Sequence, residues 1–544
     1  MPYREAGLTE KQAAAHLLSR FTYGATPGQV DVVARMGLEK WFEQQLKADL
    51  PEDSLEAQLA PFDALKLSNE EIAATYPKNG QVIRMAVRDG IIDKDSVRTD
   101  KKAYRFVLRD YMDKKGYKPE NELFRQLYSQ KIVRAAFSQN QLREVMTDFW
   151  FNHFNVSVTK NDCSQFIPAY ERDVIRPNTL GKFGDLLKAT AQSPAMLYYL
   201  DNFTSSGPMN EGRQAAFRRR FAVAMDSSAG TPAKARRPQG LNENYARELM
   251  ELHTLGVDGG YTQQDVTQAA RVLTGWTVRQ NEFFFAPNRH DKGVKTVLGK
   301  QFGPDGGETE GMELLDMLAH HPSTAHFICR KIAIRFVNDS PPSILVDKMV
   351  KTFMDKNGDI RQVLLTMVYS PEFWSAQAIR EKTKSPFELA IGAVRSLHAK
   401  IDQPMQLYAW INRMGERMYG YQAPTGFPDK GQYWINTGSL LSRMNFGLAL
   451  ATGRIPGLSF NLAALNNNHE PESAQAALVT YCHLIMPERD LEPTIKRLTP
   501  MLNDPNLPQK VNAADGQQAD TVIDGGRLTQ VVGIIIGSPE FQRR

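Results

Sequence analysis

Signals that start α-helices recur along the chain and constrain its fold more than any other feature. Thr26-Pro27-Gly28-Gln29 and Ser385-Pro386-Phe387-Glu388 each join a capping hydroxyl, a proline at the first helical position and a side-chain acceptor three residues after the hydroxyl. Thr262-Gln263-Gln264-Asp265 opens another segment in a similar way. A long helix, rich in aromatic residues at its end, is expected from about Leu123 to His153. These patterns predict a mainly α protein, a large multi-helix array.

Strand signal is concentrated in one segment, from Thr277 to Gly299. Aromatic and β-branched runs occur there and are broken by Pro287 and Gly293. The pattern predicts a small β-hairpin or short sheet near 277–299, with two or three strands that project from the helices.

Composition is that of an ordinary soluble protein. The chain has 544 residues, 42% hydrophobic and 23% charged, and a formal net charge of only +5. The small charge gives no reason to expect a nucleic-acid partner. No apolar run approaches the roughly 20 residues of a membrane span, and the first residues lack the apolar core of a signal peptide. We therefore expect a cytoplasmic protein by default, with co-export to the periplasm on a partner as the alternative.

The cysteines exclude two kinds of site. The three of them are widely separated and form no CxxC motif, which argues against a disulfide framework and against a cysteine zinc site. The chain also lacks the GxSxG, Walker, dinucleotide-binding and HExxH motifs, so the common nucleotide and serine-hydrolase chemistries gain no support.

Composition divides the chain into four regions. Residues 1–200 are an N-terminal helical region with a polar insertion at 51–120. Residues 201–240 are a basic loop rich in Ser, Gly and Pro, and residues 241–375 are a central helical region that contains the β element. Residues 376–544 are a C-terminal helical region.

The basic loop carries the run Arg218-Arg219-Arg220. Such a run fits a solvated loop arm, or a contact to an anion or an acidic partner. Because the loop leads directly into the central region, it is also placed to act as a lid over a site there.

One acidic residue of the central region, Glu248, falls on a face that should be buried. On a helix from Leu241 to Leu255, with about 100° per residue, Glu248 lies inside the apolar stripe and Asn244 and Glu251 lie on its edge. A buried carboxylate must be ion-paired, metal-bound or raised in pKa. The residue is therefore either half of a structural ion pair between helices or part of a metal or acid–base cluster facing a cleft.

Two cations accompany this acid. Arg247 has the i,i+4 spacing of a solvated ion pair with Glu243. Lys331 falls within an apolar stripe of the helix expected after Pro322, so a buried Lys331–Glu248 pair would satisfy both helices.

Two loops hold further candidates. His290 and Asp291 sit in the turn of the β element, where they fit a metal or a phosphate or sulfate group, or a turn in which Asp291 bonds its own backbone. Asp429 ends the rigid loop from Ala423, which suits a sugar or peptide cleft and also suits plain packing between helices.

Several motifs, in order, resemble a known family. They are HLLSRFTYGATPGQV, DFWFNHFNV, NENYARELMELHTLGVDGGYTQQDV, ARVLTGW, HDKGVKTVLG, HPSTAHFICRKIAIRFV, SPEFW, KSPFE and PTGFPD. From about residue 10 to its end, the chain is similar to the large bacterial family called domain of unknown function 1800. The resemblance implies a mainly helical protein of one compact unit. Because many members look exported and are encoded beside sulfatase-like proteins, it also implies a sulfatase-like partner.

Two functions compete on these observations. The first is a metal-assisted hydrolase or transferase that acts on an anionic or carbohydrate-like substrate, with a divalent metal as cofactor. Its catalytic residues would be Glu248, Glu251, His290 and Lys331, its metal ligands Glu248, Glu251, His290 and Asp291, and its substrate-binding residues Asn244, Arg247 and Asp429. The alternative is a non-catalytic scaffold or assembly partner of a sulfatase-like secreted protein.

Overall fold

The computed structural model describes residues 1–93, 101–160, 163–208, 240–503 and 527–544. Helices make up most of this part of the chain, and its strands form three two-stranded antiparallel sheets. The prediction of a mainly α fold with short β elements is therefore confirmed. No helix in the described part has both the length and the apolar character needed to cross a membrane.

The N-terminal half is helical throughout. It begins with α1 (Glu10–Phe21), α2 (Gln29–Met36), α3 (Leu38–Lys47), α4 (Asp53–Leu59), η1 (Asp63–Lys66), α5 (Asn69–Thr75), α6 (Asn79–Arg88) and α8 (Lys101–Lys115). It continues with α9 (Glu120–Phe137), α10 (Gln141–His153), η2 (Ser164–Phe166), α11 (Ile167–Ala169), the π-helix η3 (Tyr170–Ile175), α12 (Arg176–Asn178), α13 (Phe183–Ala191), α14 (Pro194–Tyr199) and η4 (Asn202–Thr204).

The central part holds the first four strands. Its elements are α16 (Asn244–Glu248), the π-helix η5 (Leu249–Thr254), α17 (Gln263–Val272), β1 (Trp276–Arg279), β2 (Glu282–Phe285), β3 (Lys295–Val297), β4 (Lys300–Phe302), α18 (Glu308–Ala319), α19 (Pro322–Phe336), α20 (Ser343–Asp355), α21 (Ile360–Val368) and η6 (Pro371–Trp374).

The C-terminal part returns to helices. Its elements are α22 (Pro386–Ser396), β5 (Lys400–Ile401), α23 (Pro404–Arg413), η7 (Gly431–Trp434), α24 (Thr437–Ala451), β6 (Leu458–Ser459), α25 (Leu462–Leu465), α26 (Ala474–Ile485), α27 (Glu492–Leu498), η8 (Thr499–Asn503) and α29 (Arg527–Gly537).

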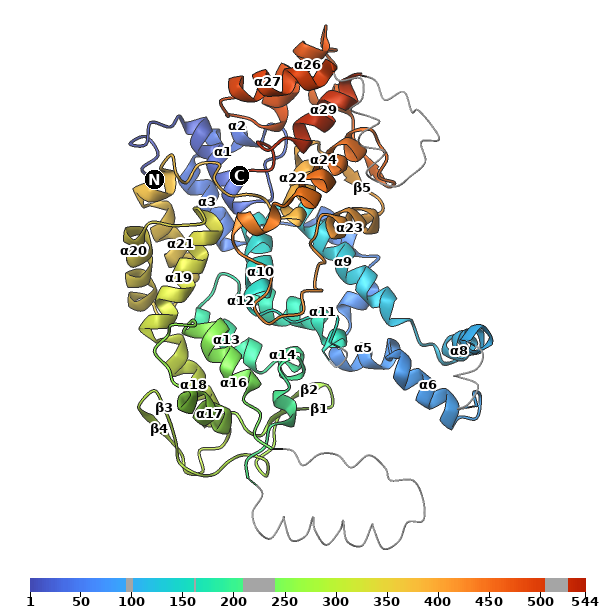
Figure 1. Cartoon of the computed structure of the whole chain (residues 1–544), viewed down its shortest axis with the longest axis vertical. Coiled ribbons are helices and arrows are strands. Elements are labelled where there is room, and N and C mark those ends of the chain that lie inside the picture. The colour runs from blue at the N-terminus through green and yellow to red at the C-terminus, as the bar shows by residue number, and fades with distance from the viewer. Residues whose placement is uncertain (94–100, 161–162, 209–239, 504–526) are drawn as a thin grey trace, which may run out of the picture.

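One apolar core links the beginning and the end of the chain. It runs from Tyr3 to Phe541 and includes buried residues of the N-terminal, central and C-terminal helical regions, with none from the 51–120 insertion. The two ends of the chain lie near each other in the upper half of the molecule, beside α1 and α22 (Figure 1). Backbone pairing between Thr383 and Arg543 fixes the last residues against the segment that leads into α22. The division into four regions stays a prediction.

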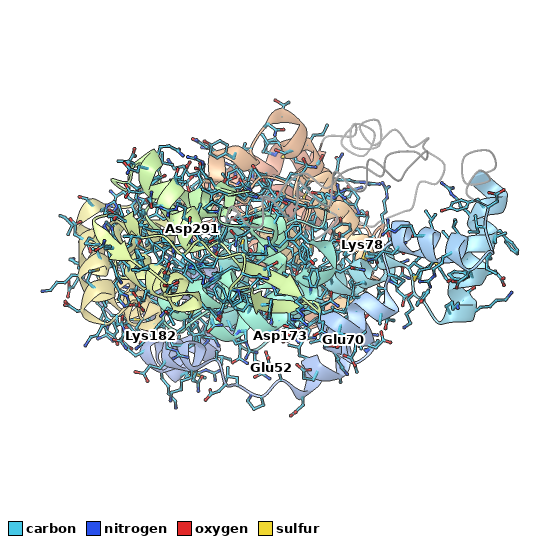
Figure 2. The ribbon with its side chains drawn as sticks, turned by 90° about the horizontal axis from the view of Figure 1, so that it is seen from below. Glu52, Glu70, Lys78, Asp173, Lys182 and Asp291 are labelled. Atoms are coloured by element: carbon cyan, nitrogen blue, oxygen red, sulfur yellow. The ribbon has the colours of Figure 1, made fainter. Side chains whose placement is uncertain are left out.

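The 51–120 insertion forms an arm with small apolar clusters of its own. Helices α6 and α8 pack on each other through a cluster that includes Val82, Ala86 and Tyr111. Figure 2 shows this pair extending past Lys78, away from the part of the molecule that contains Asp291.

The helix starts follow the sequence signals in two of three cases. Capping boxes at Ser385 and Thr262 begin α22 and α17, as predicted. The Thr26 amide does bond the Gln29 side chain at 3.0 Å, but α2 begins only at Gln29, so Pro27 lies outside the helix. The helix expected from Leu123 to His153 is two helices, α9 and α10. The Gln141 side chain donates to the carbonyl groups of Ala135 and Ser138 at the break, both at 2.9 Å, and so satisfies the end of α9.

The predicted β element is two hairpins. Strand β1 pairs with β2 in one, and β3 pairs with β4 in the other. His290 and Asp291 lie in the segment between the hairpins rather than in the turn of either one. A third small sheet, β5 with β6, lacked a sequence signal. The Arg218–Arg220 run of the basic loop lies outside the described residues.

Candidate functional site

The segment around Glu248 is not one regular α-helix. It begins as α16 and continues as the π-helix η5. A π-turn contains more residues than an α-turn, so side chains beyond it are rotated away from their α-helical positions. His253 is consequently buried, whereas Leu252 of the expected apolar stripe is partly exposed. The α-helical spacing of about 100° per residue therefore predicts the wrong buried face beyond Leu249, where the π-helix begins.

Glu248 itself is only half-buried, and the prediction that it is buried and paired is wrong. Within the described part of the chain it has no ion pair, and Lys331 pairs instead with Asp429, at 2.8 Å. Burial, and next the negative charge of Glu251, raise the pKa of Glu248. The expected surface pair is confirmed, because Arg247 lies 3.5 Å from Glu243.

Two further members of the predicted cluster make only local contacts. The exposed Asn244 side chain donates to the carbonyl of Leu200 at 3.3 Å. Glu251 is partly exposed and interacts with the Tyr261 hydroxyl. Neither observation indicates a cleft at this helix.

His290 and Asp291 belong to a satisfied network of ion pairs and hydrogen bonds. His290 bonds the carbonyl of Thr274 at 2.8 Å, and its other ring nitrogen lies 3.3 Å from the Glu310 carboxylate. Glu310 in turn pairs with the buried Lys295 at 2.6 Å. Asp291 pairs with Arg271 at 2.7 Å and accepts from the Gly293 amide at 2.8 Å, so the turn alternative is confirmed.

The predicted metal set is not assembled by these contacts. The described residues contain no group of three or more His, Cys, Asp or Glu side chains that could hold a metal ion. Glu248 and Glu251 also make no contact with His290 or Asp291 among the bonds and ion pairs found there.

A different pocket, the central pocket, is lined by residues of α9, α10, α19 and α22. This central pocket has a volume of about 80 Å³, which is room for only two or three waters at roughly 30 Å³ each. Its wall carries an unusual number of charged and aromatic side chains, among them Lys131, Asp148, Asn152, Arg335, Lys382, Glu388, Glu416, Tyr419, Phe427, Asp429, Trp434 and Arg544. Of the predicted site residues, Asp429 lines it and Lys331 contacts it through the Asp429 pair.

Lys131 and Asp148 form one side of the central pocket. The two helices α9 and α10 bring the ammonium and the carboxylate to 2.5 Å. The Lys131 ammonium also lies 4.8 Å from the centre of the Tyr419 ring and 5.4 Å from that of Phe387. Burial opposes the charge of Lys131, but the carboxylates of Asp148 and Glu171 outweigh it and raise the pKa of Lys131.

Glu416 faces the same space without a cationic partner of its own. Helix α23 ends in a turn at Gly415, whose φ is 107°, and Glu416 follows this turn into the interior. It is 8% exposed, and its carboxyl group accepts the main-chain amide of Phe387 at 2.8 Å. Burial, and next the Asp148 carboxylate, raise the pKa of Glu416 to about 7.

Glu388 forms the far wall of the pocket and is held as a carboxylate. It closes the capping box of α22 and pairs with Arg335 and, at 2.9 Å, with Arg544. Burial would raise the pKa of Glu388, but the two guanidinium groups outweigh burial and lower it to about 2. Two buried glutamates of one pocket therefore differ in protonation at neutral pH.

The other π-helix, η3 (Tyr170–Ile175), positions Tyr419 through Glu171. It places Glu171 in the interior, where Glu171 accepts from the Tyr419 hydroxyl at 2.5 Å and from Arg176 at 3.0 Å. Because this bond fixes the Tyr419 ring, it also fixes the aromatic face that lies over Lys131.

The end of the loop from Ala423 to Asp429 lines the pocket, and hydrogen bonds hold it to α10. The Asn152 side chain exchanges two hydrogen bonds with the main chain of Phe427, at 2.9 and 2.7 Å. Gly426 has a φ of 68°, and a Cβ at this position would clash with the main-chain oxygen of Asn152. The loop residue must therefore be glycine.

Sequence reasoning missed the four charged residues that matter most here: Lys131, Asp148, Glu388 and Glu416. One signal was available, because Asp148 is a lone acid among aromatic residues at the end of α10. Glu388 was assigned only a capping role, and nothing around Glu416 marks it as buried.

Comparison with known proteins gives a family but no activity. A family model described as a protein of unknown function, DUF1800, matches residues 16–543. No curated protein and no solved structure matches the chain. Since the match covers nearly the whole sequence, the chain belongs to the DUF1800 family of proteins of unknown function.

Proposed function

We propose that this protein is an acid–base enzyme, a hydrolase or transferase that acts on an anionic or carbohydrate-like substrate at the central pocket. One observation carries the proposal: Glu416 and Asp148 line the same pocket, and only Asp148 has a cation against it. Two carboxyl groups with different surroundings, one beside a cation and one without, are the usual arrangement for general acid–base catalysis.

The two carboxyl groups take different roles in this proposal. Glu416, with a pKa of about 7, gives a proton to a leaving group and takes one from water. Asp148, paired with Lys131, stabilises positive charge that develops on the reacting atom. The ammonium of Lys131 fixes the position of this carboxylate.

The size of the pocket limits what enters it. A volume of about 80 Å³ admits the reacting group and a water, so the rest of the substrate lies outside. Beside the pocket, η7 presents the partly exposed Trp434 and the exposed Tyr433, whose rings suit stacking against a sugar ring. Asp429, held by Lys331, supplies a polar acceptor at the same edge.

The test begins with protonation, which needs no substrate. The carboxyl stretch of Glu416 in the infrared, identified by its loss in Glu416→Gln, is expected to titrate near pH 7. The exposed Glu470 provides the control variant Glu470→Gln, which leaves that band in place. Titration of the band near pH 4.5 would contradict the proposal.

Turnover is then measured on chromogenic glycosides and on sulfate and phosphate esters. Glu416→Gln is expected to lower kcat by about 10²–10⁴ relative to Glu470→Gln, the range of general acid–base catalysis. Equal rates in the two variants would remove Glu416 from the mechanism. The sulfatase-like partner and the compartment stay predictions, and co-purification with such a protein tests the first of them.

A further inference from the structure

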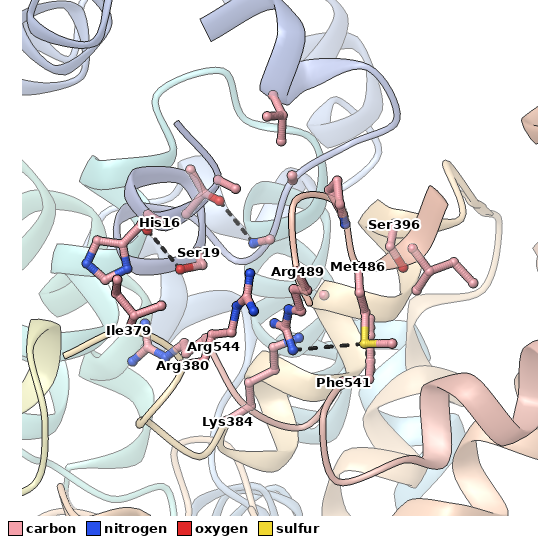
Figure 3. Close-up of a pocket in the computed structure, with 18 of the residues that line it drawn as sticks. His16, Ser19, Ile379, Arg380, Lys384, Ser396, Met486, Arg489, Phe541 and Arg544 are labelled. Carbon is pink, nitrogen blue, oxygen red and sulfur yellow. Dashed lines mark hydrogen bonds between the residues drawn. The ribbon is translucent and has the colours of Figure 1, made fainter. Parts of the chain in front are cut away.

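A second cavity, of about 220 Å³, lies between α1, α22 and the last residues of the chain. Figure 3 shows four of its cations, Arg380, Lys384, Arg489 and Arg544, gathered from three separate segments. We call this cavity the basic pocket. It shares Glu388 and Arg544 with the central pocket, but Glu416 does not line it.

Lys384 is a buried basic residue without a counter-ion. The residue is 7% exposed, and its side-chain nitrogen makes no hydrogen bond or ion pair within the described part of the chain. Its nearest defined partner is the face of the Phe541 ring, 3.9 Å from the ring centre. Burial, and next the charge of Arg489, lower the pKa of Lys384 well below its usual range.

The arginines of the basic pocket are held mainly by main-chain carbonyl groups. Arg489 donates to the carbonyls of Glu540 and, at 2.7 Å, Arg543. Arg380 donates to the carbonyl of Glu488. These bonds orient the guanidinium groups but leave their positive charge uncompensated.

The acidic residues of the basic pocket do not balance its cations. Glu388 is already shared by Arg335 and Arg544. Asp490 is exposed and makes no ion pair in the part of the chain that the structure describes. An enclosed excess of positive charge is costly unless an anion compensates it.

We propose that the basic pocket binds a small oxyanion, a phosphate or sulfate group, through Lys384 and Arg489. Guanidinium and ammonium groups are the usual donors to such oxygens. A volume of about 220 Å³ corresponds to roughly seven waters, which leaves room for the oxyanion and a small attached group. His16 and Ser19 of α1 supply polar atoms on the opposite side of the pocket (Figure 3).

The first test measures binding of inorganic phosphate and sulfate to the full chain by calorimetry and thermal unfolding. Sodium chloride at the same ionic strength is the reference. Both oxyanions are expected to raise Tm in a saturable way, because a ligand that binds only the folded state stabilises it. A rise no larger than that in chloride would overturn the proposal.

Variants locate the site. Lys384→Met is expected to raise the Kd for phosphate at least tenfold, whereas Lys351→Met, which removes an exposed lysine of α20, leaves it unchanged. Equal affinity in the two variants would overturn the assignment. If Lys384→Met does not fold, broadening of the phosphate ³¹P signal by the unaltered protein serves instead, with displacement expected from sulfate and not from chloride.

Two further comparisons complete the design. If glycerol 3-phosphate binds more tightly than inorganic phosphate, the ligand is an organic phosphate. If the two affinities are equal, the ligand is the free ion. Glu416→Gln is expected to bind phosphate normally, so failure of the acid–base proposal and failure of this one are separate outcomes.

Discussion

The helix around Glu248 and the central pocket around Glu416 each place a glutamate near a second acid, yet only Glu416 is buried. Glu248 and Glu251 lie on one short helical segment, half in solvent. Glu416 and Asp148 come from segments more than 260 residues apart and face a common pocket. The comparison teaches that a dense run of charges in the sequence does not locate a buried site, whereas convergence of remote segments does.

The strongest test of this comparison is the removal of a charge from the central pocket. Glu388→Gln keeps the size of the side chain and its capping acceptor but leaves Arg335 and Arg544 without their carboxylate. We expect a loss of about 3–5 kcal/mol in the free energy of unfolding, measured by urea denaturation. A loss below about 1 kcal/mol would mean that water already compensates these cations.

The pH dependence of stability separates the two glutamates next. The pKa of Glu416 is about 7 in the folded protein and 4.5 ordinarily, so between these values the folded state keeps a proton that the unfolded chain has lost. Stability therefore falls as the pH rises from about 4.5 to 7, by an amount on the order of 3 kcal/mol. The free energy of unfolding is measured by denaturation at pH 5 and pH 8. Relative to the unaltered protein, Glu416→Gln is expected to be more stable at pH 8 than at pH 5. An equal difference at both values would contradict the assignment, with Glu470→Gln as the control.

A smaller effect is expected from the loop that lines the central pocket. Gly426→Ala forces a side chain into a left-handed backbone and against Asn152, which we expect to cost about 1–3 kcal/mol. Gly438→Ala is the matched control, because its added Cβ makes only an ordinary contact, 3.6 Å from Oδ1 of Asn436, and alanine favours a helix. Thermal unfolding compares the two, and equal stabilities would show that the loop adapts.

The smallest effect is expected from substitution of Glu248, the residue that the sequence analysis singled out. Glu248→Gln removes a half-exposed carboxylate that has no ion pair in the described part of the chain. The free energy of unfolding should change by no more than about 0.5 kcal/mol, and turnover should be unaltered. A large loss of stability or of turnover would indicate that the functional site lies at α16 and η5.

The sequence allowed the mainly α class, two of the three helix starts and the presence of short strands to be predicted. It also allowed the Glu243–Arg247 pair to be anticipated. These features depend on residues close together in the chain, where capping, i,i+4 spacing and turn chemistry act.

The predictions that failed depend on geometry that local rules do not contain. Lys331 was expected to reach Glu248 but pairs with Asp429, which is 98 positions farther along the chain than Lys331. The π-turn at η5 changed which residues of its segment face the core. Neither outcome can be read from the periodicity of one helix.

The sequence by itself determined the kinds of element in this protein and where several of them begin, because those are set by interactions between neighbours. Tertiary structure alone decided which charges became buried and which of them found partners. Asp148, Glu388 and Glu416 are ordinary acids in the sequence. Tertiary packing buries Glu388 and Glu416, leaves Asp148 partly exposed, and gives each of the three a different partner. Burial and partnership set the protonation of a carboxyl group, so its chemistry is fixed only when the chain has folded.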